Sequence, residues 1–419
     1  MNGVVHVVGG GVAGLSAATA LAERGFRVIV YEAAPQAGGR CRSFLDDAFG
    51  ATVDNGTHLV LSGNRAVARY LRRTGATDRL TVPERARFPF ADMATGERWA
   101  LDLGAGRLPF GLLFSSARIP GTRIADYLSY RRVLAADDDD VVAATLSGLG
   151  QIYRRFWEPF ALAVLNTPPD EAAAGLLAPV LRETVLRGGR ACLPMIAPSG
   201  LSDAFVGPAL AYLEKRGGRL MTGHRLRAVE RNDDRAGNLR FADADVPISA
   251  DDSIVLAVPA WVAADLVPGL VVPDSHEPIV NAHFAVAPGR VPPAMHGKLT
   301  GVIGGTAEWM LARDDQISVT VSAARRLVER PAGEIAERLW RDVVAVAGFA
   351  DAAVPVHRVI KERRATFSQT PTQCRRRPTA RDGGPGVILA GDWTATGLPA
   401  TIEGALRSGE TAAEIVSGG

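Results

Sequence analysis

The sequence predicts an α/β protein in which a Rossmann-like domain is joined to an α+β domain that contains a helical subdomain. Three observations predict this fold. A β-branched run, a glycine-rich turn and an Ala- and Leu-rich segment follow one another in residues 4–23, which is the order strand, turn, helix. A second strand-like run and the start of a helix recur in residues 386–409. The length of 419 residues also exceeds what one hydrophobic core usually serves, so two domains are expected.

Composition narrows the function classes. Lys and Arg number 47 against 45 Asp and Glu, and the resulting net charge of +2 gives no reason to expect a nucleic-acid partner. Cys41, Cys192 and Cys374 are far apart and have no metal-ligand spacing, which predicts neither a disulfide framework nor a metal site. No export signal is evident, and no run approaches the roughly 18 apolar residues of a spanning helix. We therefore expect a cytoplasmic protein.

The N-terminal motif predicts a dinucleotide site. A strand over 4–8 runs into the glycine turn, a helix follows, and a second strand ends at Glu32. Gly9 suits the tight turn, Gly11 lets the backbone approach a pyrophosphate, and Gly14 lets the helix pack close to the strand. Glu32 lies at the separation where an acidic residue binds a ribose hydroxyl. The cofactor-binding residues expected here are Gly9, Gly11, Ala13, Gly14, Glu32 and Ala33.

A second glycine motif follows at residues 37–43, where Gly38 and Gly39 precede Arg40 and Arg42. Two glycines permit another close backbone approach, and a fixed cation could serve a longer cofactor. This element resembles the GGR element of the amine oxidase and carotenoid desaturase superfamily of FAD enzymes. The resemblance implies FAD as the cofactor, with Gly39 and Arg40 contacting it. The alternative is that both arginines are solvated loop charges.

Two further segments fit the same superfamily. Residues 386–393 are typical of a buried strand that ends in a Gly-Asp turn, and a helix is expected from about 401. The resemblance implies that Asp392 contacts the ribityl chain, that the helix N-terminus lies near the isoalloxazine, and that the Val229 backbone meets the adenine. A capping role is the alternative for Asp392. The further cofactor-binding residues are Val229, Gly391, Asp392, Thr401 and Ile402.

The domain organisation expected from these motifs is discontinuous. Residues 1–62, 196–262 and 384–419 would form the FAD-binding domain. Residues 63–195, largely helical, and 263–383 would form the substrate-binding domain. Within the latter we expect a strand over 317–321 and a helix near 332–347.

Four segments spread over the chain carry a more specific resemblance: 53–65, 157–168, 365–371 and 390–404. They are similar to elements of the hydroxysqualene dehydroxylases, also called squalene-associated FAD-dependent desaturases. The resemblance implies reductive removal of an allylic hydroxyl from hydroxysqualene to give squalene, in squalene or hopanoid biosynthesis, with hydride from reduced FAD. No second glycine-rich fingerprint is present, so an external electron donor is expected.

The chemistry requires an acid, because hydroxide is a poor leaving group. His58 is the first candidate, since its reference pKa lies near neutrality and the family element places its loop toward the flavin. Asp54 and Glu403 are the others, and burial would have to raise their pKa values. A structural, hydrogen-bonded histidine is the alternative for His58.

Other functions and contacts stay open from the sequence. A carotenoid-type desaturase or an amine oxidase would share the fold, and a flavin-fold lipid-binding protein would not need catalysis. The apolar run 108–114 suits either a lip that dips into a membrane or core packing. Anionic lipid, a reductant's phosphate or water could each face the arginines at 363, 364, 375, 376 and 377.

Overall fold

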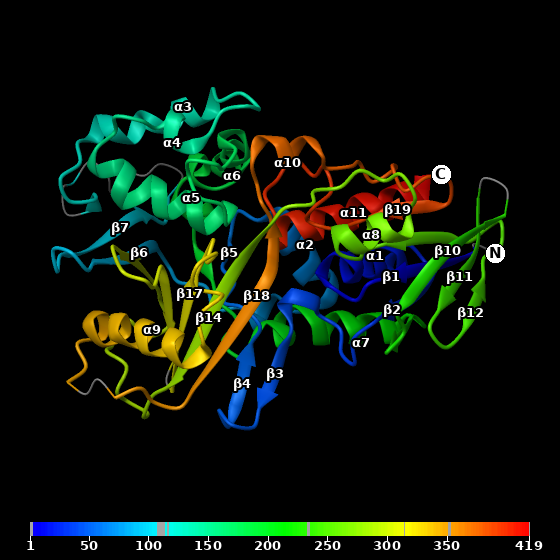
Figure 1. Cartoon of the computed structure of the whole chain (residues 1–419), viewed down its shortest axis with the longest axis horizontal. Coiled ribbons are helices and arrows are strands. Elements are labelled where there is room, and N and C mark those ends of the chain that lie inside the picture. Colours follow the sequence, from blue (N-terminus) through cyan, green and yellow to red (C-terminus); the bar gives the residue numbers. More distant parts are fainter. Residues whose placement is uncertain are drawn as a thin grey trace.

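The computed structural model describes residues 3–106, 114, 117–232, 235–313, 315–350 and 353–418. Two halves lie side by side in Figure 1, and both termini lie in the half that contains the first strand. Long strands connect this half with a second one, which carries a larger sheet and a group of short helices. The half with the termini holds the glycine-rich motifs.

A five-stranded parallel sheet forms the centre of the first half. Its order is β19-β13-β1-β2-β9, and every neighbouring pair runs parallel. Strands β1, β13 and β19 are apolar runs rich in Val and Ile, as expected where helices cover both faces of a parallel sheet, whereas the edge strand β9 is largely exposed. They come from three distant parts of the chain: β1 (Val4–Val8), β2 (Arg27–Glu32), β9 (Arg219–Thr222), β13 (Ser253–Leu256) and β19 (Val387–Leu389).

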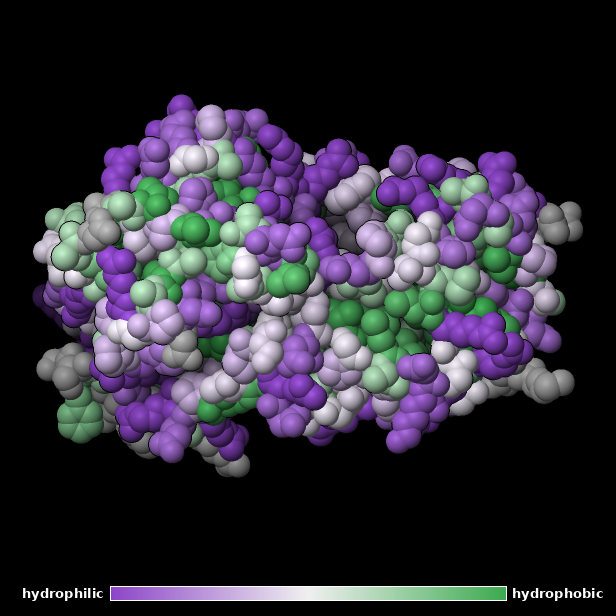
Figure 2. Space-filling model, turned by 90° about the horizontal axis from the view of Figure 1, so that it is seen from below, coloured by the Kyte–Doolittle hydropathy of each residue, from purple (hydrophilic) through white to green (hydrophobic). Residues whose placement is uncertain are grey.

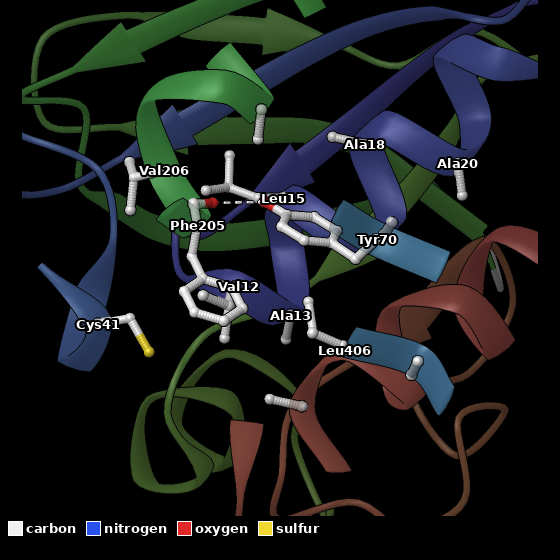
Figure 3. Packing of buried hydrophobic residues seen from close by; sticks show 14 of the residues in the cluster. Val12, Ala13, Leu15, Ala18, Ala20, Cys41, Tyr70, Phe205, Val206 and Leu406 are labelled. Atoms are coloured by element: carbon white, nitrogen blue, oxygen red, sulfur yellow. Dashed lines mark hydrogen bonds between the residues drawn. The ribbon is translucent and has the colours of Figure 1, made fainter. Parts of the chain in front are cut away.

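Helix α1 (Val12–Glu23) packs between the sheet and α11 (Ile402–Gly418). Close approach needs small residues, and a Cβ on Gly409 would lie 2.2 Å from the carbonyl oxygen of Ala13. Figure 3 shows the neighbouring core, where Tyr70 of α2 (Arg65–Thr74) donates to the carbonyl oxygen of Phe205 across 2.6 Å. Helix α7 (Gly207–Lys215) completes this layer.

The second half is built on a seven-stranded sheet of order β18-β14-β17-β16-β15-β6-β7. Helix α9 (Ala332–Ala347) covers one face, where its apolar side chains, including Leu339 and Trp340, share a core with the sheet. The strands are β6 (Ala86–Asp92), β7 (Arg98–Gly104), β14 (His276–Ala285), β15 (Leu299–Ile303), β16 (Trp309–Ala312), β17 (Gln316–Val321) and β18 (His357–Phe367).

Short helices lie above this sheet and have a core of their own around Trp157. They are η5 (Ile124–Ser129), α3 (Tyr130–Leu134), α4 (Val142–Thr145), η6 (Tyr153–Trp157), α5 (Glu158–Leu165), η7 (Ala174–Leu176), α6 (Leu177–Glu183), η8 (Val185–Arg187) and η9 (Gly189–Ala191). The remaining elements are η1 (Gly39–Cys41), β3 (Ser43–Asp46), β4 (Ala51–Asp54), β5 (Val60–Leu61), η2 (Thr77–Arg79), β8 (Pro194–Met195), η10 (Ser202–Val206), β10 (Leu226–Asn232), β11 (Arg235–Phe241), β12 (Asp245–Pro247), α8 (Ala260–Leu266) and α10 (Pro371–Arg375).

Most expected elements are present, with one difference. The C-terminal helix expected from about 401 is α11, which begins at Ile402 and reaches Gly418. Strands β6 and β7 lie within 63–195, which we expected to be largely helical, and they extend the larger sheet through parallel pairing of β6 with β15. The two strands form a local antiparallel hairpin, and only the pairing of β6 with β15 joins distant parts of the chain.

Three features of the structure concern contact with a membrane: the length of its helices, the exposure of Phe114 and the hydrophobic patches of its surface. No helix in the described part of the chain is long and apolar enough to cross a membrane. Of the apolar run 108–114, only Phe114 lies among the described residues, and it is 67% exposed. Figure 2 shows hydrophobic patches between hydrophilic residues on one face of the molecule.

Candidate flavin site

The first glycine turn leaves room for a ligand. A Cβ on Gly9, whose φ is +111°, would lie 2.3 Å from the carbonyl oxygen of Ala257, and a Cβ on Gly14 would lie 1.9 Å from that of Gly9. Both positions therefore require glycine for packing. A Cβ on Gly11 would instead meet no atom within 4 Å. Gly11 is the N-cap of α1, so the open space lies where a helix N-terminus favours a phosphate.

Glu32 is fixed at the end of β2 beside this turn. Its Oε2 accepts a hydrogen bond from the backbone N–H of Gly10 at 2.8 Å, and its Oε1 accepts one from that of Ala34 at 2.8 Å. Ala33 between them is exposed. Each carboxylate oxygen keeps a free lone pair, and this arrangement suits the hydroxyls of a ribose.

The second glycine motif folds back onto the first turn. The N–H of Gly38 donates to the carbonyl oxygen of Gly10 across 2.8 Å, and a Cβ on Gly39 would lie 3.3 Å from the Cα of Gly11. The φ angles of Gly38 and Gly39 are +116° and +55°, which favour glycine at both positions. The two motifs therefore form one continuous backbone surface.

Arg40 connects this surface to the C-terminal motif. Its guanidinium donates to Oδ1 of Asp392 across 2.7 Å and also bonds the carbonyl oxygen of Ala365. Burial lowers the pKa of Arg40 and the Asp392 carboxylate raises it, and the net direction is upward. The Arg40 side chain is nevertheless 42% exposed, whereas that of Asp392 is only 8% exposed. The accessible part of the guanidinium can thus contact a ligand.

The C-terminal motif is held rigidly. Gly391, with φ of +149°, donates its N–H to Oγ of Ser408 across 2.8 Å. Thr401 precedes α11, and its Oγ1 accepts from the N–H of Gly404 at 3.1 Å, as an N-cap does. The cap places Ile402 in the first turn of α11. The helix thereby presents its N-terminus next to the Gly-Asp turn.

Two side chains that the sequence did not single out for the flavin site support this turn. Arg377 donates to the carbonyl oxygens of Leu398 at 2.8 Å and Asp392 at 3.1 Å. Gln369 accepts from the N–H of Ala400 at 2.9 Å. Both lie in or near segments with a recognisable pattern, but only the folded chain brings them to the turn.

Val229 lies on the antiparallel sheet of β10, β11 and β12, opposite Leu239. It packs, partly buried, against the core that also contains Tyr31 of β2. The adenine contact expected for Val229 remains a proposal. The open space at Gly11, the lone pairs of Glu32 and the accessible guanidinium of Arg40 together suit an extended dinucleotide such as FAD.

His58 lies in the loop after β4. Burial lowers its pKa, and the positive charge of Arg40 lowers it further, against smaller opposing effects of Asp54 and the Arg40 backbone. The imidazole is therefore neutral at pH 7, where it can donate one hydrogen bond but is a weak source of protons. The structure thus brings His58 to the flavin site as a polar group next to Arg40.

The carboxylate of Asp54 is fully engaged by the protein. Its Oδ1 accepts from the hydroxyl of Ser43 at 2.6 Å and the N–H of Leu201 at 2.8 Å, and its Oδ2 accepts from Arg313 at 3.1 Å. These contacts fix the carboxylate between β3, the Leu201 backbone and Arg313.

Glu403 has a similar environment. It is only 4% exposed, and its two oxygens accept from the N–H groups of Ala66 at 2.9 Å and Val67 at 3.0 Å, at the start of α2. Arg407 donates to it at 2.9 Å. The carboxylate thus caps a helix N-terminus, a position that favours negative charge.

No group of three or more His, Cys, Asp or Glu side chains in the described ranges is arranged to hold a metal ion. The polar groups of the site are instead backbone N–H groups, the Glu32 carboxylate, which suits a ribose, and the ion pair of Arg40 with Asp392. This combination is typical of a dinucleotide cofactor.

The fold and the site define a flavin-dependent oxidoreductase. The family model for flavin containing amine oxidoreductases matches residues 12–417, and the chain belongs to this family. Among solved structures, wild-type putrescine oxidase bound to putrescine has a TM-score of 0.71 at 17% identity, over 100% of this chain and 99% of that one. Cyclohexylamine oxidase from Brevibacterium oxydans has a TM-score of 0.71 at 15% identity, over 100% and 99%. These likenesses show the shared fold.

Sequence relatives place the chain more narrowly, within the hydroxysqualene dehydroxylases. It is 47% identical to the hydroxysqualene dehydroxylase of Rhodopseudomonas palustris over 99% of both chains. It is 45% identical to that of Sinorhizobium fredii, over 98% of this chain and 97% of the relative. The probable zeta-carotene desaturase of Synechococcus elongatus is 26% identical over 60% of this chain and 57% of its own length.

Proposed function

We propose that this enzyme removes the allylic hydroxyl of hydroxysqualene reductively to give squalene. The observation that carries the proposal is the 47% identity with a hydroxysqualene dehydroxylase over 99% of both chains. In this reaction the C–O bond breaks, a C–H bond forms and water leaves. Bound FAD, when reduced, supplies the hydride.

The residues of the flavin site have distinct roles in this proposal. The turn at Gly11 and the N-terminus of α1 hold the pyrophosphate, and Glu32 holds the adenosine ribose. Arg40 and Asp392 fix the ribityl side, where the N-terminal and C-terminal motifs meet. Thr401 and Ile402 begin α11, and the positive end of this helix would lie toward the flavin ring.

The substrate needs an apolar environment and one polar group near its hydroxyl. Between the larger sheet and the short helices lie partly buried aromatic side chains, among them Phe88, Trp99 and Trp309, around a buried apolar cluster. They suit an isoprenoid chain and exclude water that would trap an allylic cation. Neutral His58 would accept a hydrogen bond from the substrate hydroxyl at its unprotonated ring nitrogen, because its single N–H is bonded to the Arg40 backbone.

The remaining partners follow from the same chemistry. An external donor must reduce the flavin after each turnover, because the substrate is itself reduced. We further propose that the enzyme works in the cytoplasm at the inner face of the membrane, where a C30 isoprenoid is collected. The exposed ring of Phe114 supports a peripheral contact.

The test is an anaerobic incubation of the purified protein with hydroxysqualene and reduced FAD, without nicotinamide. We expect squalene, with one reduced flavin oxidised for each squalene formed. A desaturase would instead reduce oxidised flavin when given a more saturated isoprenoid, and an amine oxidase would do so with an amine. If hydroxysqualene is returned unchanged and either of these substrates reduces the flavin, the proposed dehydroxylation is wrong and the corresponding activity takes its place.

A further inference from the structure

Asn281 of β14 is a buried side chain, only 2% exposed, whose amide is bonded on one side alone. Its Oδ1 accepts from the hydroxyl of Thr320 at 2.8 Å and from the N–H of Thr57 at 3.3 Å. Because a backbone N–H can only donate, the oxygen of the amide must face Thr57, and this fixes the orientation of the group. The two N–H donors of Nδ2 have no acceptor among the described residues, and the fold does not seal this nitrogen from solvent.

His283, two residues further along β14, shows how a polar side chain on this face is normally satisfied. Its Nε2 donates to the carbonyl oxygen of Asp54 across 2.9 Å, and its Nδ1 accepts from the hydroxyl of Ser318 at 2.9 Å. Buried polar groups are almost always paired in this way, because an unpaired donor costs free energy. The free nitrogen of Asn281 therefore indicates a place for a ligand atom that accepts a hydrogen bond.

The side chain of Asn281 lies on the face of the sheet that meets the flavin half. Its neighbours Val280 and Ala282 belong to the core under α9, so Asn281 points to the opposite face. There its own side chain bonds Thr57, the residue directly before His58. This contact brings the amide to the loop that carries the imidazole.

Gly56 shows that Asn281 and His58 border the same small region. A Cβ on Gly56 would lie 3.3 Å from Nδ2 of Asn281 and 3.4 Å from Nε2 of His58. The absence of a side chain at Gly56 keeps this region open beside both nitrogens. His58 in turn is bonded to the backbone of Arg40, whose guanidinium pairs with Asp392, so the region adjoins the flavin site.

An aromatic surface continues from Asn281 across the same face of the sheet. Thr320 lies directly opposite Asn281, and Trp309 lies directly opposite Thr320 on the next strand. Since neighbouring strands are about 4.8 Å apart, Trp309 lies about 10 Å from Asn281 on this face. The ring of Trp309 meets that of Phe90 edge-on, with centroids 5.7 Å apart. One polar point at the end of an aromatic surface matches a hydrocarbon chain that carries a single hydroxyl.

We propose that Nδ2 of Asn281 donates a hydrogen bond to the oxygen of the substrate hydroxyl and stabilises the charge on that oxygen as it leaves; this inference rests on the proposed dehydroxylation. The hydroxyl itself donates to the unprotonated nitrogen of His58, so both of its atoms are paired. The C–O bond breaks with its electron pair on oxygen, and the oxygen takes a proton from solvent and departs as water. The carbon receives hydride from reduced FAD, so each turnover consumes one hydride and one proton.

The first test compares the wild-type holoenzyme with Asn281→Asp, which keeps an oxygen for Thr57 and Thr320 but has no amide N–H to donate. Asn238→Asp is the matched control, because the amide of Asn238 donates to Glu230 at the surface. We expect Asn281→Asp to lower kcat by about 100- to 1,000-fold with unchanged flavin content, as when one donor to a developing negative charge is removed. The control should keep the wild-type kcat.

A second readout does not depend on activity. The ketone analogue of hydroxysqualene accepts a hydrogen bond but donates none, and the oxidised holoenzyme has no hydride to transfer to it. The wild type and Asn238→Asp should bind this ketone about 10-fold more tightly than squalene, the value of one hydrogen bond. The infrared band of the bound carbonyl should lie at lower frequency than in a hydrocarbon solvent.

Both effects should disappear in Asn281→Asp. Gly56→Ala should also remove them while leaving Asn281 intact, because its methyl group would narrow the region beside Nδ2. A purely structural role for Asn281 would instead weaken the binding of the ketone and of squalene alike, and this result would overturn the assignment.

Two further outcomes separate this assignment from the proposed reaction. If the wild type forms squalene but Asn281→Asp retains its kcat, or if the carbonyl band of the bound ketone is unshifted in the wild type, Asn281 does not bind the oxygen. If the wild type forms no squalene from hydroxysqualene, the proposed reaction itself is wrong and the role of Asn281 in it is lost too.

Discussion

The guanidinium of Arg40 lies 2.7 Å from Oδ1 of Asp392, so two motifs that are 352 residues apart meet in one ion pair. The carboxylate is buried, whereas the guanidinium is partly accessible. Asp392 therefore orients Arg40, and Arg40 presents its remaining N–H groups to a ligand. Both sides of the pair belong to motifs that the sequence alone assigned to FAD.

Asp392→Asn should weaken FAD binding because it removes the charge that holds Arg40. We expect the Kd for FAD to rise about 10-fold or more, as for the loss of one charge-assisted hydrogen bond. Fluorescence titration of the flavin-free protein measures this. Glu329→Gln removes a carboxylate from an exposed pair and should leave the Kd unchanged. Equal affinities for the wild type and Asp392→Asn would place the ribityl contact elsewhere.

Gly11→Val should abolish flavin binding while the protein still folds. A Cβ at this position meets no protein atom within 4 Å, so the added side chain would occupy the space for the pyrophosphate without a clash inside the protein. The protein should purify colourless with an unchanged far-ultraviolet circular dichroism spectrum. Gly333→Val also places its Cβ in open space and should stay yellow, with FAD released by heat. A yellow Gly11→Val protein would contradict the pyrophosphate assignment.

Local sequence patterns predicted the parts of the fold that short-range physics determines. The β-branched runs predicted β1 and β2, and the glycines that must approach other backbone atoms predicted the start of α1. The helix expected over 332–347 is α9. Strands β6 and β7 form a local hairpin that the sequence analysis did not predict, and its place in the larger sheet depends on the pairing of β6 with β15, about 200 residues later.

The candidate site also has a part that the local sequence predicted and a part that it did not. Its phosphate-binding turn depends on neighbouring residues, and the sequence shows it. The hydrogen bonds of Glu403 with Ala66 and Val67 join residues more than 330 positions apart, so no local sequence pattern predicts them.

Glu403→Gln should mainly affect stability. The amide can accept only one of the two α2 N–H groups, so a buried donor loses its partner at a cost of about 1–3 kcal/mol. We expect a lower Tm, with kcat per bound flavin changed by less than a few-fold. Thermal unfolding and single-turnover flavin oxidation measure the two effects separately. A large loss of kcat at unchanged Tm would restore Glu403 as a candidate acid.

His58→Ala should reduce turnover by about 10-fold, the value of one ordinary hydrogen bond to the leaving oxygen. Because burial and Arg40 hold the pKa of His58 below its usual range, the imidazole contributes a hydrogen bond rather than a proton. The flavin content of His58→Ala should not change. A loss of turnover beyond about 100-fold would return the acid role to His58.

Burial raises the pKa of Glu308, the residue directly before β16, to about 7, and this shift predicts a pH dependence of stability. In the unfolded chain a glutamate ionises near pH 4.5, whereas in the folded protein Glu308 stays protonated up to about pH 7. The stability that the protonated form contributes is complete below pH 4.5, declines as the pH rises, and is lost above about 7. The Tm of the wild type relative to Glu308→Gln should therefore fall between pH 5 and pH 7.5 and then level off. Glu329→Gln provides the control. Arg363 lowers the pKa of Glu329, so the Tm difference between the wild type and Glu329→Gln should not fall in this interval. A constant difference between the wild type and Glu308→Gln would mean that the pKa of Glu308 is not raised in the folded protein.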